Sequence, residues 1–165
     1  MEIRSAIAAD IPAVLPMVAK ICALHEQWDP AKYGFLENPA QRYDRWLGGR
    51  VGDPRSVFLV ADRGNAEQAF SAPSASIVAF LIGTAETEIP IYRIKEFGFI
   101  HDLWVEPEYR HEGIARQMAM LAVERFREMG MKQVRLDTAA ANDAARALFV
   151  ACGFRISSIE MLQEI

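Results

Sequence analysis

Apolar positions change their spacing several times along the chain, and each spacing predicts an element. A repeat of three or four residues predicts helices over 10–28, 39–47, 114–129 and 142–151. Short apolar runs bounded by Gly, Pro or Asp predict strands over 2–6, 56–62, 76–84, 97–105, 133–138 and 154–162. The stretches 63–74 and 86–96 are then long connections. This order predicts a mixed α/β fold with a mostly antiparallel sheet.

Three local features refine this pattern. A helix joins the strands at 97–105 and 133–138, so we expect them to be parallel neighbours. Pro16 lies inside the first helical pattern and predicts a bend or a later start, because proline cannot donate to the helix ladder. Gly83, near the end of an apolar strand, predicts a bulge.

The stretch from the 97–105 strand into the next helix carries candidate chemistry. Pro107 ends the strand, and helical spacing begins after Gly113. The first turn of a helix has unpaired N–H groups and a partial positive charge, which suit phosphate oxygens. Gly113 lets a ligand approach the backbone closely, and Arg110 and Arg116 add positive charge. We therefore expect phosphate to bind at this helix start.

Composition narrows the class of protein. The chain has 165 residues, 52% of them hydrophobic and 24% charged, which is typical of one globular domain over 1–165. A net charge of −4 argues against general nucleic-acid binding. We expect no signal peptide and no membrane span. Cys22 and Cys152 fit a reducing cytoplasm, and the three histidines lack metal-ligand spacing with them.

Two motifs carry a family resemblance. The segment Arg110-His111-Glu112-Gly113-Ile114-Ala115 resembles the Arg/Gln-x-x-Gly-x-Gly/Ala signature of the GNAT superfamily of N-acetyltransferases. The segment Asn142-x-x-Ala145-x-x-Leu148-Phe149-x-x-Cys152-Gly153-Phe154 resembles the family's Asn-x-x-Ala-x-x-Leu-Tyr-x-x-x-Gly-Phe stretch. The order of elements is also similar to the GNAT fold, so the resemblance covers nearly the whole chain.

The resemblance implies that acetyl-CoA lies in a gap where the two parallel strands splay apart. The implied pyrophosphate ligands are the backbone amides of His111, Glu112, Gly113, Ile114, Ala115 and Arg116, with Arg110 at the same end. Leu103 and Val105 would bond the pantetheine arm through their backbone, as an added strand does. Asn142 and Phe149 would line the arm and the thioester end. No metal is implied, and a homodimer through the last strand is a family-level expectation.

The implied reaction is attack of an amine on the thioester. A lysine-like amine has a pKa of about 10.4, so presenting it neutral at pH 7 costs about 4–5 kcal/mol and calls for a general base. His101 and Asp102 are the candidate bases, with Glu26, Glu86 and Glu96 further off. Both also have structural interpretations, as a histidine flanking a buried strand and as a loop anchor. A backbone N–H at Leu103 or Trp104 would stabilise the oxyanion.

One departure from the family pattern leaves alternatives open. Phe149 stands where many members have a tyrosine that protonates the departing thiolate, and it has no proton to donate. Cys152 or water could replace that acid, or the thiolate could leave unprotonated, since a thiol has a pKa of about 8.5. The same departure keeps open a non-catalytic acetyl-CoA sensor. Among acceptors, a small amine is favoured over a protein N-terminus or lysine.

Overall fold

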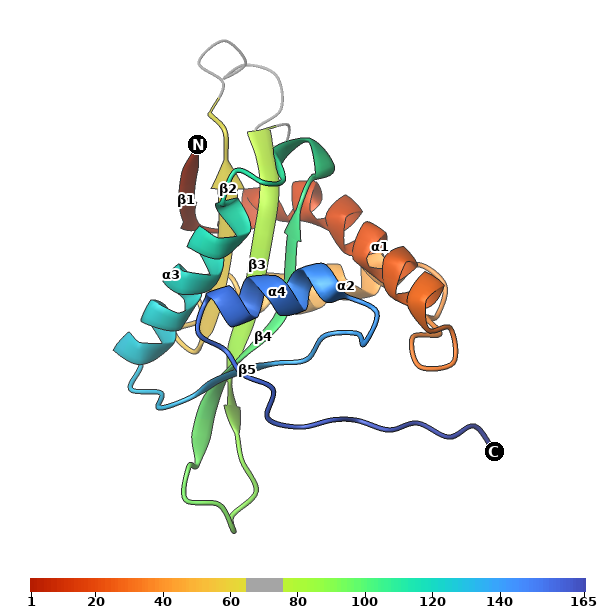
Figure 1. The fold of residues 1–165 in the computed structure, drawn as a ribbon. Helices are drawn as coiled ribbons and strands as arrows, with labels where there is room; N and C mark the ends of the chain where they lie inside the picture. Colours follow the sequence, from red (N-terminus) through yellow and green to blue (C-terminus); the bar gives the residue numbers. More distant parts are fainter. Residues whose placement is uncertain (65–75) are drawn as a thin grey trace.

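The structure, a computed structural model, describes residues 1–64 and 76–165 (Figure 1). Its strands form one five-stranded sheet in the order β1 (Glu2–Ser5), β2 (Ser56–Asp62), β3 (Ile77–Thr87), β4 (Glu96–Val105) and β5 (Val134–Leu136). The pairs from β1 to β4 are antiparallel, and β4 pairs with β5 in parallel. The predicted mixed α/β fold is therefore confirmed, and with it the parallel pair.

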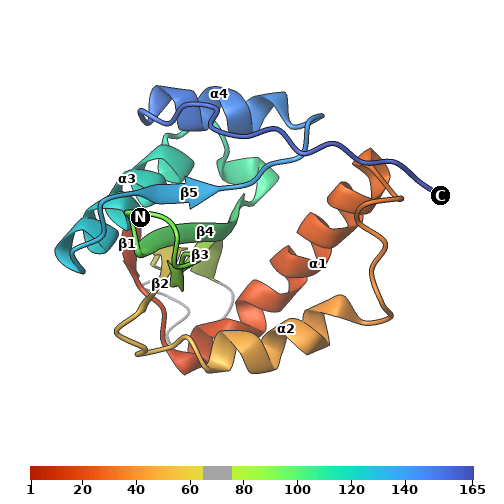
Figure 2. The same cartoon turned by 90° about the horizontal axis from the view of Figure 1, so that it is seen from below.

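Helices cover both faces of this sheet. They are α1 (Ile11–Trp28), α2 (Pro39–Gly48), α3 (Ile114–Glu128) and α4 (Asp143–Ala151), with 3-10 turns at Ala8–Asp10 and Pro107–Tyr109. Figure 2 shows α1 and α2 on one side of the sheet and α3 and α4 on the other. Alternate residues of β2 fill two apolar layers, with Val57 and Leu59 facing α3 and Phe58 and Val60 facing α1. Because strands β2 and β3 are buried on both faces, their sequences are unbroken apolar runs.

Pro16 does not delay the start of helix α1. The helix begins at Ile11 and continues through Pro16 to Trp28, so the expected late start is wrong. By length and composition alone, the stretch Ala8–Trp28 is apolar enough to cross a membrane. In the structure its residues Val14 and Met17 are buried in the layer that contains Phe58 and Phe80. Here the helix is a core element of the α/β fold.

Two glycines allow α3 to approach the sheet. The ring of Phe126 is fully buried and lies over Gly83 of β3 and Gly98 of β4. A Cβ atom at Gly98 would lie 2.4 Å from Cγ of Phe126, well inside van der Waals contact. Gly98 also pairs with Val134, the first residue of β5. The close approach therefore fixes α3 over the point where β4 and β5 are joined.

Replacing Gly98 should destabilise the fold because the fully buried Phe126 ring already occupies the space that a side chain would need. We expect Gly98→Ala to cost about 1–3 kcal/mol, the usual range for overpacking a core. At this chain length the melting temperature should fall by about 2–4 °C for each kcal/mol. Gly48→Ala is the matched control, since a Cβ there meets nothing within 4 Å. A Gly98→Ala protein that melts at or above the wild-type temperature would contradict this packing.

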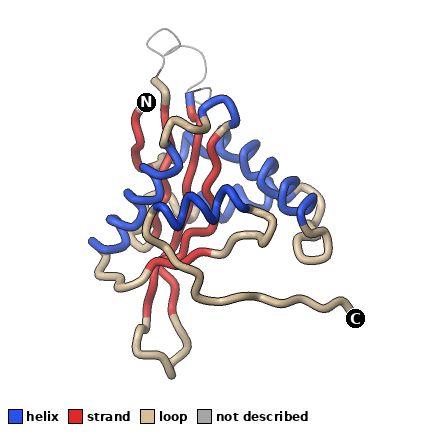
Figure 3. Tube along the Cα trace, viewed as in Figure 1, coloured by secondary structure: helices blue, strands red, loops and turns tan. Residues whose placement is uncertain are grey.

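The strand expected over 154–162 is wrong. Residues from Phe154 onward form neither helix nor strand, and Figure 3 draws this tail as an extended loop that leaves the sheet. No described strand pairs with it, and a run of apolar residues becomes a strand only when its backbone groups find a ladder partner. An ion pair between Glu160 and Lys32 instead holds the tail towards the end of α1. The homodimer expected through this segment stays a prediction.

The other boundaries agree with the sequence to within a few residues. Strands β3 and β4 extend further into the 86–96 connection than expected, to Thr87 and from Glu96. Strand β5 is shorter than the predicted 133–138. The connection expected at 63–74 falls largely outside the described residues.

Candidate functional site

Strand β4 is paired with β5 over only part of its own length. Gly98, Phe99 and Ile100 pair with the three residues of β5, and the pairing ends at Leu136. On its other side β4 stays paired with β3 as far as Val105. One edge of β4 is therefore open from residue 102 to residue 105. This confirms the predicted splaying of the two parallel strands.

A small cleft of about 70 Å³ lies at this fork. Its walls come from α1, β4, the end of β5 with the segment that follows it, and α4. They consist of Ile21, His25, Ile100, His101, Asp102, Leu103, Leu136, Asp137, Thr138, Asn142, Ala145 and Phe149. Five residues singled out from the sequence meet here, namely His101, Asp102, Leu103, Asn142 and Phe149. The structure thus brings together the candidate bases and the residues expected at the thioester end.

A bulge in β4 explains why two consecutive side chains face the same helix. Ile82 pairs with Asp102 and Gly83 pairs with Ile100, so His101 is an extra residue without a partner on β3. Consecutive strand residues normally point to opposite faces. Here the His101 ring lies 5.2 Å from the ring of Trp46 on α2, and Asp102 also contacts α2. The bulge predicted at Gly83 is confirmed, with the extra residue on the opposing strand.

Asp102 is held by a residue that the sequence did not single out. The Tyr43 hydroxyl, from α2, donates a hydrogen bond to Oδ2 of Asp102. Burial raises the pKa of Asp102, while the Tyr43 bond and the nearby His101 and His25 lower it. Burial and the charge of Asp102 raise the pKa of Tyr43, so the phenol keeps its proton and remains the donor.

Burial favours the neutral form of both histidines in the cleft. Burial lowers the pKa of His101 below its ordinary value, as does the charge of Arg50, whereas Asp102 and Glu86 raise it. Burial likewise lowers the pKa of His25, whose ring stacks on Tyr33 at 4.7 Å between centroids. His25 was not predicted as a site residue, because helical spacing does not tell which sheet residue a helix side chain faces.

The start of α3 presents unpaired backbone amides, as predicted. The first helical bond runs from the N–H of Gln117 to the carbonyl of Gly113 at 3.0 Å. Among the described residues, none accepts a hydrogen bond from the N–H groups of residues 111–116. His111 and Gly113 are left-handed, with φ of 67° and 80°. Left-handed residues in such a turn direct successive N–H groups into one concavity, which suits an anion.

The side chain of Arg110 holds the loop at residues 111–116 against the end of β4. Its Nε donates to the carbonyl oxygen of Val105 at 2.9 Å, and its guanidinium lies 4.7 Å from the ring centroid of Trp104. The Val105 carbonyl, expected to serve the pantetheine arm, therefore already has one protein partner. Arg116 is exposed at the same helix end. Arg110 thus ties the amide loop to the end of β4.

Helix α4 contributes an amide and a phenyl ring. Oδ1 of Asn142 caps the helix by accepting from the N–H of Ala145 at 3.1 Å, and no described residue accepts from its Nδ2. The Phe149 ring is 8% exposed and contacts Phe154 at 5.4 Å. Cys152 packs among the apolar residues around α3 and does not line the cleft. Neither Phe149 nor Cys152 therefore brings a proton donor to the cleft.

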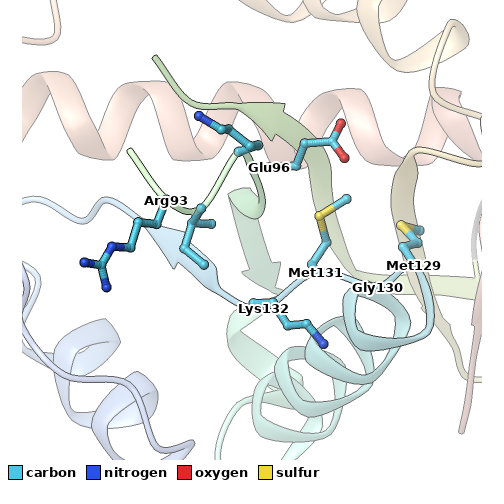
Figure 4. A pocket seen from close by; sticks show the side chains of 8 residues that line it. Arg93, Glu96, Met129, Gly130, Met131 and Lys132 are labelled. Carbon is cyan, nitrogen blue, oxygen red and sulfur yellow. The ribbon is translucent and has the colours of Figure 1, made fainter. Parts of the chain in front are cut away.

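A second pocket lies at the far end of α3 and carries none of these features. It has a volume of about 220 Å³ and is lined by residues 93–96 and 129–132 (Figure 4). The charged ends of Arg93 and Lys132 point apart in Figure 4, and Glu96 is paired with Arg55. Although this pocket is larger, its polar groups do not converge on one point, so the cleft at the fork is the candidate site.

The contribution of Asp102 to the free energy of unfolding should become less favourable as the pH rises. Its pKa is raised in the folded state, so the folded protein holds this proton more tightly than the unfolded chain, and stability falls as the pH rises through the folded pKa. We expect Asp102→Asn to raise the melting temperature at pH 7, by an amount that shrinks towards pH 4. Asp44→Asn, an exposed change next to Tyr43, is the control. An Asp102→Asn protein that melts below wild type at pH 7 would contradict this prediction.

A mixed sheet with a parted parallel pair, next to a helix start with free amides, is the architecture of the GNAT acetyltransferases. The chain belongs to the acetyltransferase (GNAT) family, whose family model matches residues 21–154. Among curated proteins, human N-acetyltransferase 8 is 28% identical over 127 residues, which make up 76% of this chain and 54% of the relative. The chain therefore spans about half the length of this relative.

Solved structures share the whole fold at low sequence identity. A mutant BH1408 protein from Bacillus halodurans has a TM-score of 0.80 at 20% identity, covering 100% of this chain and 99% of that one. An aminoglycoside 6'-N-acetyltransferase from Acinetobacter haemolyticus has a TM-score of 0.69 at 15% identity, with 100% and 99% coverage. Glucosamine-6-phosphate N-acetyltransferase from Arabidopsis thaliana has a TM-score of 0.67 at 17% identity, with 99% and 97% coverage. Likeness at this identity establishes the fold.

Proposed function

We propose that the protein transfers an acetyl group from acetyl-CoA to the primary amine of a small molecule. The observation that carries this proposal is the set of free amides at residues 111–116 beside the open edge of β4. Membership of the GNAT family supports the acetyl transfer. The names of the human relative and of two structural neighbours, all N-acetyltransferases, support an amine acceptor.

Acetyl-CoA fits the residues that are present. Its pyrophosphate matches the amide concavity at 111–116, where the partial charge of the α3 start favours an anion. Its pantetheine arm contains two amides, which match the edge of β4 beyond its pairing with β5 as an added strand would, with the Val105 carbonyl shared with Arg110. The Nδ2 of Asn142 is free to donate to an arm carbonyl, and Phe149 supplies apolar contact at the thioester end.

The reaction is direct displacement at the thioester. The neutral amine nitrogen forms a bond to the acyl carbon, the carbon–sulfur bond breaks, and coenzyme A leaves with the sulfur. The ammonium form of the acceptor first loses one proton to a base, for which His101 and Asp102 are placed in the cleft. The amine loses a second proton as the amide forms, and one proton returns to the thiolate. A thiolate tolerates late protonation, since thiols have a pKa of about 8.5.

The cleft favours a small cationic acceptor. Its volume of about 70 Å³ suits a single amino group and its neighbouring carbons. Asp102 and Asp137 line it, and Glu86 lies close to His101, so several carboxylates attract an ammonium group. These features favour small amines over a protein lysine or N-terminus, which would need an open groove for a peptide.

Binding and turnover are tested separately. Calorimetry with coenzyme A and acetyl-CoA measures binding, and thiol release is then followed with aminoglycosides, glucosamine 6-phosphate, polyamines, and peptides with free N-termini or lysines. We expect tight binding of both forms of the coenzyme and turnover with at least one small amine. Turnover with peptides alone would replace the small acceptor with a protein. Binding without turnover on any amine would replace the enzyme with an acetyl-CoA sensor.

A further inference from the structure

Two polar side chains, those of Thr84 and Glu86, connect His101 to the protein surface. Its Nε2 lies 2.7 Å from Oγ1 of Thr84 on the neighbouring strand β3. The Thr84 hydroxyl in turn donates to Oε1 of Glu86. Thr84 is only 4% exposed, whereas the Glu86 side chain is 45% exposed. This hydrogen-bonded chain thus runs from the cleft to the neighbouring strand β3, and from there to solvent.

This arrangement determines which nitrogen of His101 carries the proton. A threonine hydroxyl has one proton to donate, and here it goes to the Glu86 carboxylate, which can only accept. The Thr84 oxygen must therefore accept from Nε2, so the Nε2 of a neutral His101 carries the hydrogen. The lone pair is then on Nδ1. No described residue makes a hydrogen bond to Nδ1, and His101 lines the cleft.

We propose that Thr84 and Glu86 are positioning residues that hold neutral His101 as its Nε2–H tautomer, so that Nδ1 is the base that takes the proton of the acceptor amine. This inference rests on the proposed acetyl transfer and names the base for it. The amine N–H bond breaks and an Nδ1–H bond forms. The resulting imidazolium keeps its Nε2–H on Thr84, and its charge lies 3.7 Å from Oε1 of Glu86. The proton on Nδ1 later leaves to water.

The surroundings of His101 support this role. The ring is held between Trp46 of α2 and Phe99 of β4, at centroid distances of 5.2 and 5.0 Å, so its orientation is restricted. The charged groups that face it are Asp102 on β4, Glu86 on β3 and Arg50 after α2. The two carboxylates favour the imidazolium and Arg50 opposes it, while burial keeps the resting ring neutral. Asp102 is itself engaged by Tyr43.

The tautomer can be measured without any turnover, by two-bond nitrogen–carbon-proton NMR correlations of the imidazole rings in uniformly nitrogen-15-labelled protein. For wild type above its titration midpoint, we expect a pyridine-like Nδ1 and a pyrrole-like Nε2 at His101. In Thr84→Val the preference should shift towards the other tautomer or a mixture of both. Thr87→Val, the same change at an exposed position of the same strand, should leave the spectrum unchanged. A wild-type Nδ1–H tautomer overturns the proposal.

Kinetics test whether this tautomer matters for the reaction. We expect Thr84→Val to lower kcat about 10- to 100-fold, part of the usual contribution of a general base, with the KM for acetyl-CoA unchanged. Thr84→Ser, which keeps the hydroxyl, should restore most of the rate. Glu86→Gln should move the acid limb of the kcat/KM profile to lower pH, because the lost carboxylate no longer raises the pKa of His101.

A purely structural role predicts different results. Thr84→Val would then lower the melting temperature but leave the pH profile and kcat at wild-type values, and that result overturns the proposal. If no amine is acetylated by wild type, the proposed function fails. The NMR experiment still decides the tautomer in that case, so the two failures are distinguishable.

Discussion

Gly113→Glu is expected to weaken coenzyme A binding at least about 100-fold, or about 3 kcal/mol, while the protein still folds. The loss combines several charge-assisted hydrogen bonds, each worth about 1.5–3 kcal/mol, with repulsion between the new carboxylate and the pyrophosphate. At Gly113 a Cβ would meet only the Nε2 of Gln117 at 3.7 Å, so the larger side chain has room in the concavity. There its oxygens would occupy the amides of residues 111–116.

The backbone cost of this substitution has to be separated from the electrostatic effect. Gly113 has a φ of 80°, where an L-residue costs about 1–2 kcal/mol. Gly130 lies at the opposite end of α3, has a φ of 85°, and has open space around its Cβ position. Gly130→Glu therefore carries the same strain and charge away from the amides. We expect both variants to lose stability and only Gly113→Glu to lose binding by calorimetry.

The coenzyme A affinity of the Gly113 variants tests the proposed phosphate site directly. A folded Gly113→Glu protein that binds coenzyme A with wild-type affinity would show that the helix start is not the anion site. Gly113→Ala gives an intermediate test, since it adds the strained φ without a charge. Its affinity should fall less than that of Gly113→Glu.

His101→Gln should lower kcat about 10²- to 10⁴-fold, the usual contribution of a positioned general base. The glutamine amide can still donate to the hydroxyl of Thr84, so the local packing is preserved while the base is lost. The affinity for coenzyme A should stay within a factor of a few, because the amides of 111–116 are unchanged. The pH dependence of kcat/KM should lose the limb that reports the His101 titration.

His25 is the comparison that makes this prediction specific. It lines the same cleft from α1 and is also neutral, but no described hydrogen bond fixes its tautomer. We therefore expect His25→Gln to have the smaller effect on kcat. If His25→Gln abolishes turnover while His101→Gln retains the wild-type rate, the base is on α1 and the assignment to β4 is wrong.

Much of the fold could be predicted because most of its helices and strands have a local pattern of apolar, polar and capping residues. Strand β2 was predicted with its observed bounds, because the apolar run from Val57 to Ala61 lies between the polar residues Ser56 and Asp62. The start of α4 was also predictable, because Asn142 caps the helix with its own side chain. The C-terminal strand failed for the opposite reason. Its apolar residues, including Ile156 and Ile159, needed a partner strand, and no local pattern supplies one.

The candidate site also has one part that the sequence could predict and one part that depends on the tertiary structure. The proposed anion-binding half is one continuous segment, His111 to Arg116, whose free amides follow from a helix start and a glycine, so the sequence alone could predict it. The proton-handling half depends on contacts between distant segments. Tyr43 reaches Asp102 across 59 positions and Thr84 reaches His101 across 17, while His25 arrives from α1. Only the pairing of β3 with a bulged β4, and the packing of α1 and α2 on them, decides these contacts, because no periodic pattern in the sequence predicts side-chain hydrogen bonds between remote segments.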